Sequence, residues 1–236
     1  MQSSPRTPTQ IVAIGASAGG IDALRMIIGG LPDDFAPAIF VVLHTAADSP
    51  GVLAAILQRA GRLPAVCVRV RDPIRQGHIY VAAPDRHLLV EHNRAIATRG
   101  PKENRFRPAI DPLFRSAAHA YGPGVIGVIL SGGLDDGSGG LLAIKQQGGT
   151  TIVQDPTTAL NPSMPRSALR MVDVDHCLAV EQIAPLLLRL AAAQTPPSAM
   201  PSTTPGNFSL ARRAAFPGEP HPELRVALEE SRELLR

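Results

Sequence analysis

Residues 11–24, IVAIGASAGGIDAL, decide the fold class of this chain. An apolar run, IVAIGA (11–16), ends at a glycine-rich turn, and apolar residues then recur at helical spacing from Ile21 onward. A buried strand followed at once by a helix is the first half of a βαβ unit. The same alternation returns when FAPAIFVVLH (35–44) precedes a helical stretch at 50–61, and when VIGVIL (125–130) precedes another at 141–149.

This alternation predicts an α/β fold, with a doubly wound, mostly parallel sheet flanked by helices. A further strand is expected at 150–155, and further helices at 111–122, 167–172 and 183–193. The stretch 79–98 contains two extended segments separated by a turn. We interpret it as a small antiparallel hairpin inserted into the parallel fold.

Composition divides the chain into four parts. Residues 1–10 form a polar leader, and 11–193 form one folded domain. Residues 194–222 are proline-rich with little apolar periodicity, which predicts a disordered linker. Residues 223–236 form a short amphipathic helix, which we expect to be solvated or weakly docked. Because only ten polar residues precede the first strand, we expect a domain that stands alone at this end.

Charge and hydropathy exclude several classes of protein. The formal net charge of +3 is spread along the chain, so no nucleic-acid partner is expected. No apolar run approaches the ~20 residues of a membrane span, and the polar leader does not resemble a signal peptide. We therefore expect no direct membrane insertion and a cytoplasmic location. Cys67 and Cys177 lie in apolar runs and are expected to be buried, reduced thiols.

Ser17 is the candidate nucleophile. Gly15-Ala16-Ser17-Ala18-Gly19 satisfies G-x-S-x-G between a strand and a helix, where a helix N-terminus favours a developing oxyanion. The alternative is a dinucleotide-binding loop or a plain packing turn. A G-x-G-x-x-G loop would place glycine at position 17 and an acidic residue at the end of the next strand. That strand ends instead at His44.

His44 and one of two aspartates complete a possible catalytic triad. The ends of neighbouring strands lie ~4.8 Å apart, so His44 could reach Ser17. Asp135 and Asp136 follow the strand 125–130, and one of them could orient the histidine. We expect Nε2 of His44 to face Ser17 Oγ and Nδ1 to face the carboxylate of the orienting aspartate. The alternative roles are a structural or helix-capping histidine and a helix-capping aspartate.

Several ordered motifs resemble the bacterial chemotaxis protein-glutamate methylesterase (CheB) family between about Ile11 and Leu190. They are GASAGG, VVLH, GHIYVAAPDRHLL, NRFRPAIDPLFRS, GVILSGGLDDGSGG and QDPTTALNPSMPRSAL. The resemblance implies a methylesterase-like catalytic domain over 11–193. In that family's arrangement Ser17 is the nucleophile, His44 the general base and acid, and Asp136 the residue that orients His44.

The resemblance also implies a substrate and its contacts. Members of this family hydrolyse glutamyl methyl esters on methylated helical chemoreceptors, some also deamidate glutamine, and no metal or organic cofactor is needed. Backbone N–H groups of Ala18 and Gly133 would form the oxyanion hole, and Arg107 and Met164 would contact substrate. The basic residues Arg99, Lys102, Arg105 and Arg107 could steer acidic receptor helices, or they could belong to a solvated charged loop.

The sequence departs from the family pattern in three places near the site. Ala18 stands where threonine is frequent, Leu43 where glutamine is frequent, and Phe106 where histidine is frequent. Typical members also begin with a receiver domain, whereas only ten polar residues precede the first strand of this sequence. We therefore expect a stand-alone catalytic domain that is not regulated by phosphorylation in cis. The rival hypotheses are a serine esterase with another substrate, an interaction module with weakened catalysis, and a nucleotide-binding protein.

Overall fold

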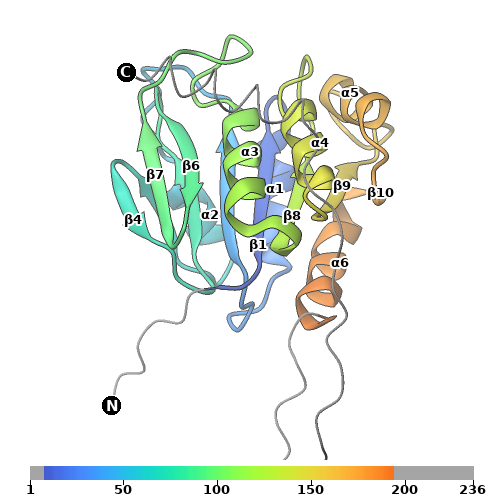
Figure 1. The fold of residues 1–236 in the computed structure, drawn as a ribbon, viewed down its shortest axis with the longest axis horizontal. Coiled ribbons are helices and arrows are strands. Elements are labelled where there is room, and N and C mark those ends of the chain that lie inside the picture. Colours follow the sequence, from blue (N-terminus) through green and yellow to red (C-terminus); the bar gives the residue numbers. More distant parts are fainter. Residues whose placement is uncertain (1–7, 194–236) are drawn as a thin grey trace, which may run out of the picture. The chain divides into compact units, whose positions relative to one another are not determined.

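The computed structural model describes residues 8–193, and its centre is a seven-stranded parallel sheet. Its strand order is β10-β9-β8-β1-β2-β5-β3 (Figure 1). The strands are β1 (Ile11–Ala16), β2 (Ala38–Leu43), β3 (Ala65–Val68), β5 (Ile79–Ala82), β8 (Val125–Ile129), β9 (Thr150–Gln154) and β10 (His176–Leu178). The predicted fold class is confirmed.

Helices cover both faces of this sheet, as Figure 1 shows. One face carries α1 (Gly20–Gly29), α2 (Leu53–Ala60) and α6 (Val180–Ala193). The other carries α3 (Ile110–Tyr121), α4 (Ser138–Gln146) and α5 (Ser163–Met171), with a short 3₁₀ turn at Gly122–Gly124. Side chains alternate along β1, so Val12 and Ile14 pack on the first face and Ile11 and Ala13 on the second. Burial on both faces explains why β1 is a continuous apolar run.

The predicted hairpin at 79–98 is partly wrong. Its first segment is β5, which pairs in parallel with β2 and β3 inside the main sheet. The antiparallel part consists of β6 (His87–Glu91) and β7 (Arg94–Thr98), joined by β4 (Arg71–Pro73) in a separate three-stranded sheet. β5 is apolar and its first three residues are buried, so its burial favours the main sheet over a surface hairpin.

The order of the strands reverses at β1, whose two neighbours are β2 and β8. Ligand sites of open α/β sheets lie at the carboxyl ends of the strands next to such a reversal. Ser17 follows β1 directly, His44 follows β2 directly, and Asp136 lies in the loop after β8. The topology therefore brings all three candidate residues to one edge of the sheet.

Three further predictions have different outcomes. Neither cysteine forms a disulfide, but Cys177 is exposed and Cys67 is only half-buried, so the prediction that both are buried is wrong. Cys67 lies in β3 and Cys177 in β10, which are the two edge strands of the sheet. Other elements cover these edge strands less completely. Among residues 8–193, no helix combines the length and the apolar character that crossing a membrane requires. Residues 1–7, the predicted linker at 194–222 and the predicted helix at 223–236 lie outside the described part.

Candidate active site

Ser17 lies at a tight turn between β1 and α1. Gly19 precedes the helix with a left-handed backbone (φ 78°), and a Cβ atom there would lie 2.5 Å from Cβ of Leu160. The N–H of Ser17 donates to the carbonyl of Ser131 at 2.9 Å, which ties this turn to the loop after β8. Ser17 is therefore held at the end of β1 by the left-handed backbone of Gly19, which glycine adopts readily, and by the hydrogen bond to Ser131.

His44 reaches Ser17 from the neighbouring strand. The N–H of His44 donates to the carbonyl of Ala16 at 3.1 Å, which continues the parallel pairing of β1 with β2 by one residue. Nδ1 of the imidazole lies 3.2 Å from Ser17 Oγ. The His44 side chain is 4% exposed, so this hydrogen bond is largely shielded from water.

The expected assignment of the two ring nitrogens is wrong. Nδ1 of His44 faces Ser17, whereas Nε2 faces Oδ2 of Asp136 at 2.7 Å. Nδ1 is the ring nitrogen nearer the backbone, and Ser17 stands on the adjacent strand. Asp136 lies beyond β1 on the loop after β8, and the outer nitrogen extends towards it. The order serine, imidazole, carboxylate is the one that a triad requires.

Asp136 is completely buried and accepts several hydrogen bonds. Besides His44, it accepts from the backbone N–H of Ile110 at 2.7 Å, the side-chain amide of Asn104 at 2.7 Å and the N–H of Asp111 at 3.2 Å. Burial alone raises the pKa of Asp136, but the hydrogen bonds from His44, Ile110 and Asn104 outweigh it and lower the pKa below its usual value. The carboxylate is therefore held in its charged form.

The alternative role of Asp136 as a cap of its own helix does not fit the structure. Gly137 is the residue before α4, and no side chain caps that helix. The carboxylate instead meets the N-terminus of α3, where the N–H groups of the first turn lack helical partners. The neighbouring Asp135 is exposed and takes no part in this network.

A tight turn at 103–106 closes over the proposed triad. Its contacts with His44 and Asp136 were not predicted from the sequence. Glu103 and Phe106 exchange two backbone hydrogen bonds, while Asn104 (φ 49°) and Arg105 (φ 73°) lie in the left-handed region. Asparagine is one of the few residues that adopt this conformation readily, so the dipeptide Asn104-Arg105 was a usable turn signal.

The side chains of this turn contact the other two residues of the proposed triad, His44 and Asp136. The Asn104 amide donates to Asp136 and also to Asp111 at 2.8 Å. The ring of Phe106 stacks on the imidazole of His44, with centroids 3.6 Å apart and planes 8° apart. Phe106, noted above as a departure from the family pattern, therefore packs directly against the histidine.

Arg107, an expected substrate contact, is engaged within the chain. Its guanidinium donates twice to Oδ1 of Asp85, at 2.8 and 2.6 Å, and to the carbonyl of Gly100 at 2.7 Å. Arg99 binds the other oxygen of Asp85 at 2.7 Å. The hydrogen bond from Arg107 lowers the pKa of Asp85. These contacts anchor the 99–107 loop, and a contact of Arg107 with substrate stays a prediction.

Met164, the second expected substrate contact, is completely buried. It packs beneath Gly132, where an added Cβ atom would lie within 3 Å of Sδ of Met164 and of Cβ of Ser17. The close packing that the structure shows for Met164 is therefore with the glycine loop beside the serine. A direct contact with substrate stays a prediction.

The two expected oxyanion donors differ from their neighbours in hydrogen bonding. The N–H groups of Ser17 and Gly132 donate to backbone carbonyls. Within residues 8–193, the N–H groups of Ala18 and Gly133 have no recorded acceptor. They are thus available to an incoming oxygen atom, and their role as the oxyanion hole stays a prediction. In the same range, no group of three or more His, Cys, Asp or Glu side chains could hold a metal ion.

The fold and these side chains define a class: an α/β protein with the Ser-His-Asp arrangement of the serine hydrolases, at the carboxyl edge of a parallel sheet. Residues 12–187 match the family described as CheB methylesterase. The chain belongs to this family.

Relatives and a solved structure agree with this membership. A Leptospira interrogans protein named putative protein-glutamate methylesterase/protein-glutamine glutaminase is 41% identical over 182 residues, which cover 77% of this chain and 94% of that protein. A similarly named Anaeromyxobacter dehalogenans protein is 40% identical, and the match covers 74% of this chain but 51% of the relative. The crystal structure of the Thermotoga maritima CheB methylesterase catalytic domain matches with a TM-score of 0.73 and 32% identity, covering 77% of this chain and 98% of that one.

Proposed function

We propose that this protein is a protein-glutamate methylesterase that hydrolyses glutamyl methyl esters on methylated helical chemoreceptors. The observation that carries the proposal is the continuous hydrogen-bonded chain Ser17–His44–Asp136 in a member of the CheB methylesterase family. The names of the relatives support the same substrate class. The proposal places the protein in the cytoplasm and requires neither metal nor organic cofactor.

Acylation follows from the positions of the three side chains. With Nε2–H of His44 donating to Asp136, Nδ1 is free to accept the proton of Ser17. Ser17 Oγ then attacks the ester carbonyl carbon, and the resulting oxyanion is held by N–H groups of Ala18 and Gly133. When the C–O bond to the methoxy group breaks, His44 returns the proton and methanol leaves.

Deacylation repeats the same steps with water. His44 takes a proton from water, the hydroxide attacks the acyl-serine, and the proton passes to Ser17 Oγ as free glutamate forms. During both steps the imidazole becomes positively charged beside the carboxylate of Asp136, which is kept ionised by its hydrogen bonds. A glutamine amide would follow the same route with ammonia as the leaving group, which is the glutaminase activity in the relatives' names.

The decisive experiment measures methanol release from a methylated chemoreceptor by the purified protein. We expect Ser17→Ala to lower the rate by ~10⁴-fold or more, because the nucleophile is lost, and His44→Ala to lower it about as far. The double variant should be no slower than either single variant, because the two residues act as one unit. Ser167→Ala on α5, which lies outside the triad, is the control.

Labelling with a fluorophosphonate separates the rival hypotheses. A protein that labels at Ser17 but releases no methanol would be a serine esterase with another substrate. A protein that neither labels nor releases methanol would be an interaction module without catalysis. Methanol release that survives Ser17→Ala would contradict the serine mechanism itself.

A further inference from the structure

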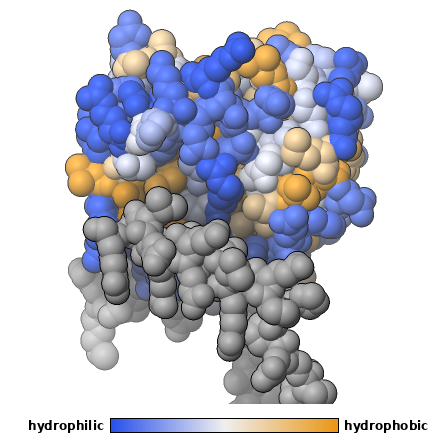
Figure 2. Space-filling view, turned by 45° about the horizontal axis from the view of Figure 1, so that its top comes forward, coloured by the Kyte–Doolittle hydropathy of each residue, from blue (hydrophilic) through white to orange (hydrophobic). Residues whose placement is uncertain are grey.

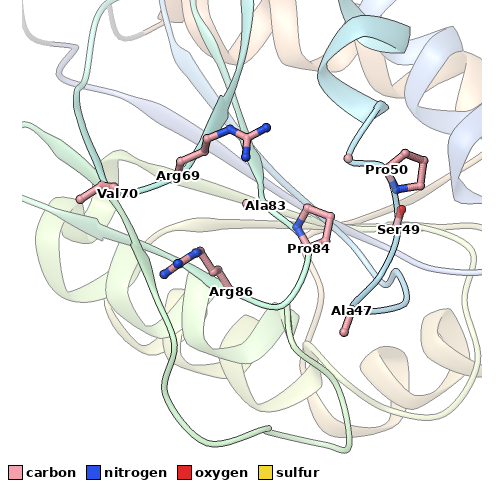
Figure 3. Close-up of a pocket in the computed structure, with 9 residues that line it drawn as sticks. Ala47, Ser49, Pro50, Arg69, Val70, Ala83, Pro84 and Arg86 are labelled. Atoms are coloured by element: carbon pink, nitrogen blue, oxygen red, sulfur yellow. The ribbon is translucent and has the colours of Figure 1, made fainter.

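A pocket opens at the same edge of the sheet as Ser17. It has a volume of about 400 Å³ and lies between the loop after β2 and the ends of β3 and β5 (Figure 3). Ser49 and Pro50 line it from the loop, Arg69 and Val70 from the end of β3, and Pro84 and Arg86 from the segment after β5. Figure 3 shows the guanidinium of Arg69 extending towards the loop that carries Ser49 and Pro50.

The pocket carries two arginine side chains that have no ion-pair partner in the described part of the chain. Among residues 8–193, neither Arg69 nor Arg86 forms an ion pair with a carboxylate. Asp85, the acidic residue beside Arg86 in the chain, is already bound by Arg99 and Arg107. An unpaired guanidinium is suited to bind a carboxylate, and Arg69, which extends towards the Ser49–Pro50 loop, and Arg86, which extends towards the side of Val70, each offer one (Figure 3).

The rest of the lining suits the aliphatic part of an acidic side chain. Val70 is 73% exposed at the pocket, and Ala47, Ala83 and the prolines add apolar surface. In the view with the top of Figure 1 turned forward, hydrophilic residues predominate in the upper part of the molecule, with separate hydrophobic areas among them (Figure 2). A glutamate side chain, with a short apolar stem and a terminal carboxylate, matches this combination.

The pocket lies at a defined distance from the proposed nucleophile. β5 and β3 are the second and third strands from β1 along the sheet. At ~4.8 Å between strands, the pocket lies roughly 10–15 Å from Ser17. An α-helix advances ~1.5 Å per residue, so seven residues cover ~10.5 Å and return to nearly the same face.

We propose that this pocket, the Arg69–Arg86 pocket, binds an acidic side chain of the protein substrate two helical turns from the esterified glutamate. This inference rests on the proposed function, because it takes the substrate to be an acidic helix. The pocket thus selects for acidic helices by binding, while the triad performs the chemistry. The ligand is a carboxylate of the substrate itself.

The test measures binding in the Ser17→Ala background, so that it does not depend on turnover. The probe is a fluorescent helical peptide with a γ-methyl glutamate and a glutamate seven positions away. A matched peptide carries glutamine at that second position. We expect Arg69→Gln combined with Arg86→Gln to weaken binding of the glutamate peptide about tenfold, and to leave the glutamine peptide within about twofold.

A second pair of arginines provides a matched control. Arg59 and Arg62 lie at or just after the end of α2, at the opposite edge of the sheet, and form no ion pair with the described residues. Arg59→Gln with Arg62→Gln removes the same charge and should leave both affinities within about twofold. Equal weakening by the control pair would overturn the proposal, because it would show a general effect of net charge.

Hydrolysis of p-nitrophenyl acetate separates docking from chemistry. With Ser17 intact, the Arg69/Arg86 double variant should retain wild-type kcat on this neutral ester. A parallel loss of ester turnover would overturn the proposal, since the arginines would then support the triad. Equal weakening of both peptides would also overturn it. If the wild type binds the glutamate peptide selectively but releases no methanol from it, the proposed function fails while the pocket stands.

Discussion

Two carboxylates hold the same segment, from Arg99 to the first residue of α3, Ile110, in contrasting ways. Asp85, which is partly exposed and which we call the outer anchor, binds the guanidiniums of Arg99 and Arg107. Asp136, which is completely buried and which we call the inner anchor, accepts hydrogen bonds from the side-chain amide of Asn104 and the backbone N–H of Ile110. Both carboxyl groups have a lowered pKa, but fixed positive charges neutralise only Asp85.

The difference between charged and neutral donors explains how the charge of Asp136 stays available to His44. Among the described residues, the donors to Asp136 other than His44 are neutral. They keep the carboxylate ionised without cancelling its charge, so the charge remains available when His44 becomes an imidazolium. An arginine partner, as at Asp85, would compete with the imidazolium for that charge. In the proposed mechanism the inner anchor, Asp136, thus supports the chemistry, whereas the outer anchor, Asp85, holds the loop.

Replacing the inner carboxylate gives the largest expected effect. We expect Asp136→Asn to lower kcat by about 10²- to 10⁴-fold, because an amide no longer stabilises the imidazolium or selects the tautomer. Asp135→Asn is the matched control and should cost less than about tenfold, because Asp135 is exposed. Turnover of a methylated peptide measures both. A larger loss at Asp135 would move the orienting role to that residue.

The same variant has a distinct pH signature. Because the pKa of Asp136 is lowered on folding, its stabilisation is fully present above the ordinary value of about 3.9 and is lost as the pH falls through the lowered value. Asp136→Asn removes this contribution. Urea unfolding between about pH 6 and pH 2.5 should show the stability difference between the two proteins narrowing at low pH. A constant difference would contradict the assigned direction.

Removing the neutral bridge should have an intermediate effect. Asn104→Ala deletes a hydrogen bond to a buried charge, and we expect kcat to fall about tenfold with little change in KM for a small ester. Asn104→Asp should fall further, because it places a third carboxylate beside Asp136 and Asp111. If Asn104→Asp matched the wild type, the inner anchor would not depend on neutral donors.

The stacked ring should contribute less. Phe106→Leu retains apolar cover over His44 but loses the aromatic stack, and we expect kcat to fall about two- to tenfold. Phe106→Tyr keeps the ring and should restore activity. Melting temperatures of both variants show whether a loss reflects histidine orientation or folding. No recovery with tyrosine would mean that the stack itself does not position the imidazole.

The outer anchor should affect activity least. Asp85→Asn leaves Arg99 and Arg107 without their charged partner, so we expect a lower melting temperature. Turnover of a small ester should change by less than about threefold, because the contacts of Asp136 remain. A loss of turnover as large as that of Asp136→Asn would contradict a purely structural role for Asp85.

The sequence by itself determined the α/β class and the three residues of the proposed triad. Hydrophobic periodicity is a local property, so the strands and helices around the site could be identified from it. The rule that sites lie at the carboxyl ends of parallel strands then indicated Ser17, His44 and the pair Asp135 and Asp136, and the resemblance to the CheB family selected Asp136 from that pair. No knowledge of side-chain contacts was needed for that step.

Only the tertiary structure decided how those residues are arranged and supported. The ring nitrogen that faces Ser17 depends on where β8 lies relative to β1, and the place of β5 depends on which strands bury it. The contacts of Asn104 with Asp136 join loops that no local pattern relates. The physical reason is that periodicity reports which face of an element is buried, whereas hydrogen bonds between loops depend on the packing of the whole chain.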